Sequence, residues 1–137
     1  MKDHGKEKVI FIADDDNAVR ASLQKYLISC GFHVRGLEDG LSLILLCQHL
    51  TPDLIISDIR MPCMDGISLI QELQKREETK NIPVIFISAF YDSDILKTAK
   101  TLGAKEFLLK PFSLDNLDQA IERTLAISEY QAWMEYT

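Results

Sequence analysis

Short runs of consecutive apolar residues alternate along this chain with longer stretches in which apolar residues recur every three or four positions. The short runs are typical of strands that are buried on both faces of a sheet. They predict strands at residues 9–13, 32–37, 54–57, 82–87 and 106–109. The longer stretches are typical of helices that bury one face. They predict helices at residues 17–30 and 41–50, and further helices around residues 67–73, 95–102 and 114–125.

Strands and helices follow one another in alternation, which favours a parallel sheet with helices on both faces. We expect an α/β fold: a doubly wound five-stranded parallel sheet with the flavodoxin-like strand order 2-1-3-4-5. Residues 9–128 form one domain in this interpretation, and a chain of 137 residues is long enough for it. Residues 1–8 are polar and predict a flexible leader, whereas residues 129–137 predict an extension of the last helix or a tail.

Composition and charge argue against several classes of function. The formal net charge is −6 and no basic stripe follows a helix, so direct binding of nucleic acid is not expected. The three cysteines lack CxxC spacing and there is no signal peptide, which favours a cytoplasmic location. The most apolar stretch, residues 41–47, is far shorter than the roughly 20 residues that span a bilayer, so no membrane association is expected.

Charged and hydroxyl residues follow four of the predicted strands. Asp14 and Asp15 come after the first strand, Asp58 after the third, Ser88 after the fourth and Lys110 after the fifth. The carboxyl ends of parallel strands meet at one edge of a sheet, where ligands of such folds bind. Clustered carboxylates repel one another unless a cation lies among them. The pattern therefore predicts a hard divalent metal beside one carboxylate that takes part in chemistry.

The same positions form a set of motifs in a fixed order. The motifs are Asp14-Asp15, Asp58-x-x-Met61-Pro62-x-x-Asp65-Gly66, Ser88-Ala89 and Lys110-Pro111-Phe112. Over about residues 8–127, the chain resembles the receiver domain of two-component response regulators. The last helix, at residues 114–123, is similar to that of receivers attached to nitrogen-regulation-type activators or hybrid kinases.

The resemblance implies a metal-assisted phosphoacceptor site. Asp58 would accept a phosphoryl group from the phosphohistidine of a histidine kinase or phosphotransfer protein. The cofactor would be Mg²⁺, which Asp58 and Asp15 would coordinate directly and Asp14 would hold through water, with the backbone carbonyl of Arg60 as a further ligand. Mg²⁺ prefers oxygen ligands and retains several waters, so a few carboxylates and a phosphate suit it.

Three further residues have roles that the resemblance implies. Ser88 would donate a hydrogen bond to a phosphoryl oxygen, and Lys110 would pair with the phosphate. Phe107 stands at the family's aromatic switch position, where tyrosine is frequent. Because Phe107 lacks the hydroxyl, we expect it to act through packing alone and to prefer an inward position. The family also tends to have a cis peptide before the proline that corresponds to Pro111.

The expected function is a phosphorylation-controlled switch in a phosphorelay, and not a metabolic enzyme: the chain would catalyse only its own phosphotransfer and autodephosphorylation. Phosphoryl transfer depends on positioning and charge neutralisation. The sequence has no Walker A motif, so ATP is not expected as the direct donor. Phosphorylation would shift the face formed by the fourth helix, the fifth strand and the last helix, and this face would bind a partner or form a homodimer.

Arg60 and Phe90 lie two residues beyond Asp58 and Ser88, respectively. These positions are expected to flank the access to the phosphoryl group. We hypothesise that the bulk of Phe90 and the reach of Arg60 hinder an attacking water and prolong the phosphorylated state.

Several other residues near the motifs have structural interpretations. Asp16 is predicted to cap the first helix, and Ser113 to cap the last one. Asp65 is predicted to form a turn. Cys63 is interpreted as an incidental exposed thiol.

Three other functions compete with this interpretation. A Mg²⁺-dependent phosphatase of the haloacid dehalogenase type also forms an aspartyl-phosphate, but it needs a second Asp where this chain has Arg60. A flavodoxin-like nucleotide binder needs Ser, Thr and Gly after the first strand, where this chain has three aspartates that would repel a phosphate. A receiver-shaped docking module that no longer takes phosphate is disfavoured by the complete acidic site and by Lys110.

Overall fold

The computed structural model describes residues 7–136, so most of the predicted leader lies outside the described residues. Within them the chain forms five strands, β1 (Val9–Ala13), β2 (His33–Leu37), β3 (Leu54–Asp58), β4 (Val84–Ser88) and β5 (Glu106–Leu109). The helices are α1 (Asn17–Ser29), α2 (Gly40–Cys47), α3 (Gly66–Gln74), α4 (Ser93–Thr101) and α5 (Leu114–Tyr136). All neighbouring strands are parallel, in the order β2-β1-β3-β4-β5, which confirms the predicted fold class and strand order.

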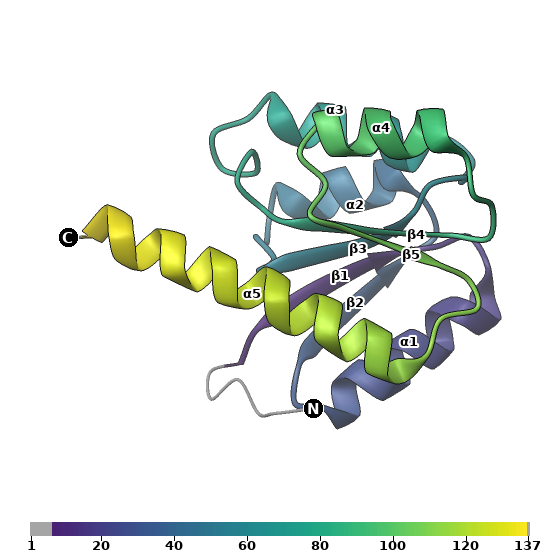
Figure 1. The fold of residues 1–137 in the computed structure, drawn as a ribbon, viewed down its shortest axis with the longest axis horizontal. Coiled ribbons are helices and arrows are strands. Elements are labelled where there is room, and N and C mark those ends of the chain that lie inside the picture. The colour runs from purple at the N-terminus through teal and green to yellow at the C-terminus, as the bar shows by residue number, and fades with distance from the viewer. Residues whose placement is uncertain (1–6, 137) are drawn as a thin grey trace.

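Helices α1 and α5 cover one face of the sheet, and α2, α3 and α4 cover the other (Figure 1). Successive strand residues point to opposite faces. In β1, Ile10 and Ile12 therefore pack toward α1 and α5, whereas Phe11 and Ala13 pack toward the other three helices. All four of these residues have no exposed surface. Burial on both faces explains why the strands read as continuous apolar runs rather than as alternating patterns.

Strands β1 and β5 have the predicted bounds, and most other element ends before α5 differ from the predicted ones by one to three residues. We predict the fourth strand at residues 82–87, but it begins at Val84, after Pro83, which has no N–H to donate to a sheet ladder. Strand β4 ends at Ser88 and β3 ends at Asp58, each one residue later than predicted, and these ends matter for the site. Both polar residues are the last residues of central strands.

Glycine follows the ends of two of the helices. Gly31 follows α1 with a φ of 98°, and Gly103 follows α4 with a φ of 99°. This left-handed conformation is unfavourable for residues with a Cβ, which is why glycine stands at both positions. Helix α2 is predicted to end at about residue 50, but it stops at Cys47.

Helix α5 is much longer than the strands that it covers. It continues to Tyr136, and its C-terminal turns extend beyond the sheet (Figure 1). Residues 129–136 thus continue the last helix. None of the helices in the described part of the chain is both long and apolar enough to cross a membrane.

Candidate functional site

The sheet register places the predicted site residues at one edge. Across the ladders, Ala13 pairs with Ser57, Asp58 pairs with Ile87, and Ser88 pairs with Leu109. The residues that end or follow these strands, Asp14, Asp58, Ser88 and Lys110, are therefore brought together, as the parallel arrangement predicts. The position of Asp14 is fully buried, and Asp58 is 8% exposed.

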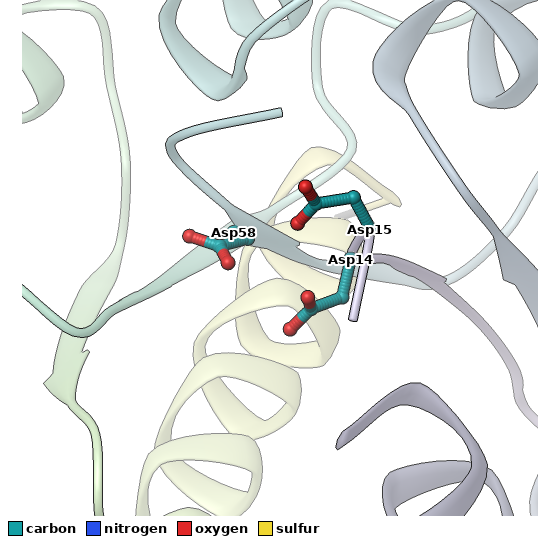
Figure 2. Close-up of side chains that lie close together, drawn as sticks. All are labelled: Asp14, Asp15 and Asp58. Carbon is teal, nitrogen blue, oxygen red and sulfur yellow. The ribbon is translucent and has the colours of Figure 1, made fainter. Parts of the chain in front are cut away.

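Three carboxylates gather at this edge. Asp14, Asp15 and Asp58 each contribute one carboxylate oxygen to a group in which all oxygens lie within 4.8 Å of one another (Figure 2). Asp14 and Asp58 are buried, and Asp15 is exposed. A set of hard oxygen donors at this spacing, open to solvent on one side, fits Mg²⁺, which binds carboxylates and keeps water ligands.

Lys110 reaches the carboxylates from the end of β5. Its Nζ lies 2.9 Å from Oδ2 of Asp14 and 2.9 Å from Oδ2 of Asp58. Partial burial lowers the pKa of Lys110, but the hydrogen bonds to Asp14 and Asp58 and the negative charges of these carboxylates together raise it more, so the pKa lies above its ordinary value. The ammonium therefore remains protonated and offsets part of the repulsion between the two buried carboxylates. The Lys110–Pro111 peptide bond is cis.

The main chain around Asp58 holds its second oxygen. Oδ1 of Asp58 accepts a hydrogen bond of 2.7 Å from the N–H of Ile59, and the N–H of Arg60 lies 3.4 Å away. Gly66 closes the loop that follows, because its N–H donates to the carbonyl of Ile59. A Cβ at Gly66 would lie 2.7 Å from the carbonyl oxygen of Asp58 and 2.8 Å from the ring of Phe86. Only glycine allows this close approach.

The acidic loop after β1 is held by its own hydrogen bonds. Oδ1 of Asp14 accepts from the N–H of Asp16 at 2.9 Å. Oδ1 of Asp16 accepts from the N–H groups of Ala18 and Val19, which confirms that Asp16 caps α1. Asp16 therefore caps the helix, while Asp14 and Asp15 lie in the group of three carboxylates at the edge of the sheet.

Arg20 is a residue of this region that the sequence analysis did not identify. Its Nη1 donates a hydrogen bond of 2.7 Å to the main-chain carbonyl of Asp14, and its Nη2 donates one of 2.6 Å to Oδ1 of Asn17. The available signal was its place four residues after Asp16, one helical turn beyond the acidic loop. Side chains of a helix lean toward its N-terminus, so a long cation at this position reaches back to that loop.

Ser88 is engaged with the loop that follows β4. Its hydroxyl donates a hydrogen bond of 3.1 Å to the carbonyl of Phe90 and accepts one of 3.2 Å from the N–H of Phe90. The guanidinium carbon of Arg60 lies 4.7 Å from the centroid of the Phe90 ring. The structure thus brings Arg60 and Phe90 into contact with each other, across the loops that follow Asp58 and Ser88.

Phe107 lies in the middle of β5, directly beside Phe86 across the β4–β5 ladder. It is half-buried and packs against the core cluster that contains Phe86 and Ala99. A cavity of about 650 Å³ lies next to it, lined by residues of α4, β5 and the start of α5, including Leu96 and Phe112. Space for a change in packing therefore exists beside the predicted switch residue.

Two further residues that the sequence analysis singled out cap helices, and a third is exposed. Asp65 caps α3, since its Oδ1 accepts from the N–H of Ser68 at 2.8 Å. Ser113 accepts from the N–H of Asn116 at 3.0 Å and so caps α5, as predicted. Cys63 is exposed and has a φ of 66°.

The chain is similar to known signalling proteins. The family model of the response regulator receiver domain matches residues 10–122. NtrC of Escherichia coli K12, a DNA-binding transcriptional regulator, is 36% identical over 123 residues, which are 90% of this chain and 25% of NtrC. PdtaR of Mycobacterium tuberculosis H37Rv is 33% identical over 123 residues, which are 89% of this chain and 58% of PdtaR. The chain therefore spans about a quarter and about three-fifths of these relatives, respectively.

A similar fold is found in the structure of NtrX from Brucella abortus. It superimposes with a TM-score of 0.87 at 26% sequence identity. The match covers 95% of this chain and 29% of the NtrX chain.

Proposed function

Because the chain belongs to the response regulator receiver domain family, we propose that it acts as a switch that is phosphorylated on Asp58. One observation carries the proposal: the Asp58 carboxylate lies 2.9 Å from the Lys110 ammonium and within a group of three carboxylates. The proposed donor is the phosphohistidine of a histidine kinase or phosphotransfer protein.

The proposed reaction is a direct transfer between two side chains. A carboxylate oxygen of Asp58 attacks the phosphorus, the phosphorus–nitrogen bond breaks, and its electron pair returns to the imidazole of the donor. The N–H of Ile59 fixes one oxygen of Asp58, and Lys110 supplies positive charge at the other. Such transfer is accelerated mainly by positioning and charge neutralisation, which these contacts provide.

Asp14, Asp15, Asp58 and the main-chain carbonyl of Arg60 are the proposed ligands of Mg²⁺. When bound, Mg²⁺ neutralises negative charge on the phosphoryl oxygens. The support from this chain is the spacing of the three carboxylates and their hard oxygen donors.

The proposed switch starts at Ser88 and Phe107. To donate a hydrogen bond to a phosphoryl oxygen, the Ser88 hydroxyl must leave the carbonyl of Phe90, to which it now donates. A phosphoryl group adds about −1.5 to −2 charge at neutral pH, which attracts both this hydroxyl and Lys110. The cavity beside Phe107 allows that ring to repack in response. The proposed output is a changed face of α4, β5 and α5 that binds a partner or a second copy of the chain.

Arg60 and Phe90 are proposed to control access to the phosphoryl group. The support is their contact across the two loops that follow β3 and β4. Together they place an aromatic ring and a guanidinium group beside the ends of these strands.

The test is incubation of the chain with acetyl phosphate and MgCl₂, followed by intact mass measurement. We expect the wild type to gain the mass of one phosphoryl group and Asp58→Asn to gain none. Asp53→Asn is a matched control, since Asp53 stands before the opposite end of β3, where its carboxylate accepts from Val9. A wild type that stays unmodified refutes the proposal, and sustained hydrolysis of a phosphomonoester would favour a phosphatase instead.

A further inference from the structure

Arg20 ties helix α1 to the peptide group between two proposed metal ligands. The carbonyl that accepts from its Nη1 is that of Asp14, and it belongs to the peptide group that joins Asp14 to Asp15. Nη2 of Arg20 is held at the same time by Oδ1 of Asn17. A guanidinium group is planar and presents its donors in a rigid fork, so two bonds at once fix its orientation.

The orientation of this peptide group sets the directions in which the two carboxylates leave the main chain. The Asp14 carboxylate reaches Lys110 with one oxygen and the N–H of Asp16 with the other. The Asp15 carboxylate is exposed and lies in the same group of oxygens as those of Asp14 and Asp58 (Figure 2). A rotation of the peptide group would move one carboxylate away from the other.

We propose that Arg20 is a positioning residue for the Mg²⁺ site. It holds the Asp14–Asp15 peptide group so that both carboxylates face Asp58. The inference rests on the proposed function, because it concerns the same metal site. Arg20 acts through a main-chain carbonyl, one step behind the carboxylates, and outer partners of this kind typically change metal affinity by about 10- to 100-fold when they are replaced.

The positive charge of Arg20 has the opposite effect. A guanidinium cation near the site repels Mg²⁺, so removal of the charge alone would tighten Mg²⁺ binding. Loss of positioning would weaken it. The sign of the change in affinity therefore separates a positioning role from a purely electrostatic one.

The test is calorimetric titration of the whole chain with MgCl₂ for the wild type, Arg20→Gln and Arg20→Lys. Arg20→Gln removes the charge and the fork, whereas Arg20→Lys keeps the charge and removes only the fork. We expect Arg20→Lys to bind Mg²⁺ about tenfold more weakly, and Arg20→Gln to bind it more weakly by a smaller factor, because removal of the charge opposes the loss of positioning. Unchanged or tighter binding by Arg20→Gln, or wild-type affinity in Arg20→Lys, would overturn the inference.

Asn17→Ala provides a second, milder perturbation. It removes the anchor of Nη2, so we expect weaker Mg²⁺ binding than in the wild type but no further loss when it is combined with Arg20→Gln. Fully additive losses would mean that Asn17 acts independently, which contradicts the inference.

Arg123→Gln is the matched control. Its guanidinium also makes a 2.8 Å bond, to Glu106, but joins α5 to β5 away from the acidic loop. We expect its Mg²⁺ affinity to equal that of the wild type. Thermal melts without Mg²⁺ monitor the fold, because a merely structural role of Arg20 would lower the melting temperature and leave the affinity unchanged.

The two proposals fail in different ways. Equal Mg²⁺ affinity in the wild type and in the Arg20 variants overturns only the positioning role. Absence of Mg²⁺ binding in the wild type overturns the proposed metal site and the role of Arg20 with it.

Discussion

Arg60 lies over the ring of Phe90 at 4.7 Å and so joins the loop after β3 to the loop after β4. Phe90 is 58% exposed, so the contact lies at the surface. The same Phe90 bonds through its main chain to the hydroxyl of Ser88. The proposed switch hydroxyl and the proposed barrier to water therefore share one residue, and movement of Ser88 toward a phosphoryl group would loosen the stack.

The first prediction concerns the lifetime of the aspartyl-phosphate. Phe90→Ala and Arg60→Ala should lose phosphate about two- to fivefold faster than the wild type, since a cation–π contact at an exposed site contributes about 0.5–1 kcal/mol. The measurement is the decay of the phosphorylated mass after removal of the donor. Tyr91→Ala, which removes the neighbouring exposed ring, should leave the rate unchanged. Unchanged or slower phosphate loss in both Phe90→Ala and Arg60→Ala would show that these side chains do not hinder an attacking water.

The second prediction concerns charge at the acidic edge. Without Mg²⁺, Asp58→Asn should raise the free energy of unfolding by about 1 kcal/mol, because one of three repelling carboxylates is removed while Asp14 still pairs with Lys110. At ten times its dissociation constant, Mg²⁺ should stabilise the wild type by about 1.4 kcal/mol. Mg²⁺ should stabilise the Asp58→Asn variant by less than it stabilises the wild type. Urea unfolding with and without MgCl₂ measures both, and an equal gain in the variant would contradict Asp58 as a ligand.

The third prediction concerns the thiols. Burial raises the pKa of Cys47 to about 11, so below that pH its thiolate form is scarce, whereas Cys63 is exposed. Only thiolates react with iodoacetamide. At pH 8, labelling should therefore modify Cys63 quickly and Cys47 slowly, and the Cys47 rate should rise as the pH approaches 11. Peptide mass mapping over time measures this; equal rates at pH 8 would show that Cys47 is accessible.

The fourth prediction concerns the contact between α1 and α5. The Tyr26 hydroxyl donates a hydrogen bond of 2.6 Å to Oδ1 of Asp118. Tyr26→Phe should lower the free energy of unfolding by about 1.5 kcal/mol, as expected for a hydrogen bond to a charged group. Tyr91→Phe, on a ring that is 66% exposed, is the control and should have little effect.

The same hydrogen bond, followed by burial, raises the pKa of Tyr26 above its ordinary value. A raised pKa in the folded state stabilises the protein fully below the unfolded pKa of about 10 and loses this effect as the pH rises further. The stability difference between wild type and Tyr26→Phe should therefore be constant at neutral pH and shrink above pH 10. A constant difference up to pH 11 would contradict this assignment.

Much of the candidate site could be predicted because its residues follow strands. The end of a buried apolar run is visible in the sequence, and parallel strands bring their carboxyl ends to one edge. That reasoning placed Asp14, Asp58, Ser88 and Lys110 together. It did not place Arg20, because a position one helical turn beyond the acidic loop allows a cation to reach back to the main chain but does not decide whether it bonds there or faces solvent.

The amino-acid sequence by itself determined the order of strands and helices, the two covered faces of the sheet and the identity of the acidic residues, because periodicity and motif spacing are local properties of the chain. Only the tertiary structure decided which atoms meet. Lys110 reaches Asp14 across 96 positions of sequence, and Tyr26 reaches Asp118 across 92. Such contacts depend on strand register and on how the helices pack, and these are settled by burial of the whole core rather than by any single segment.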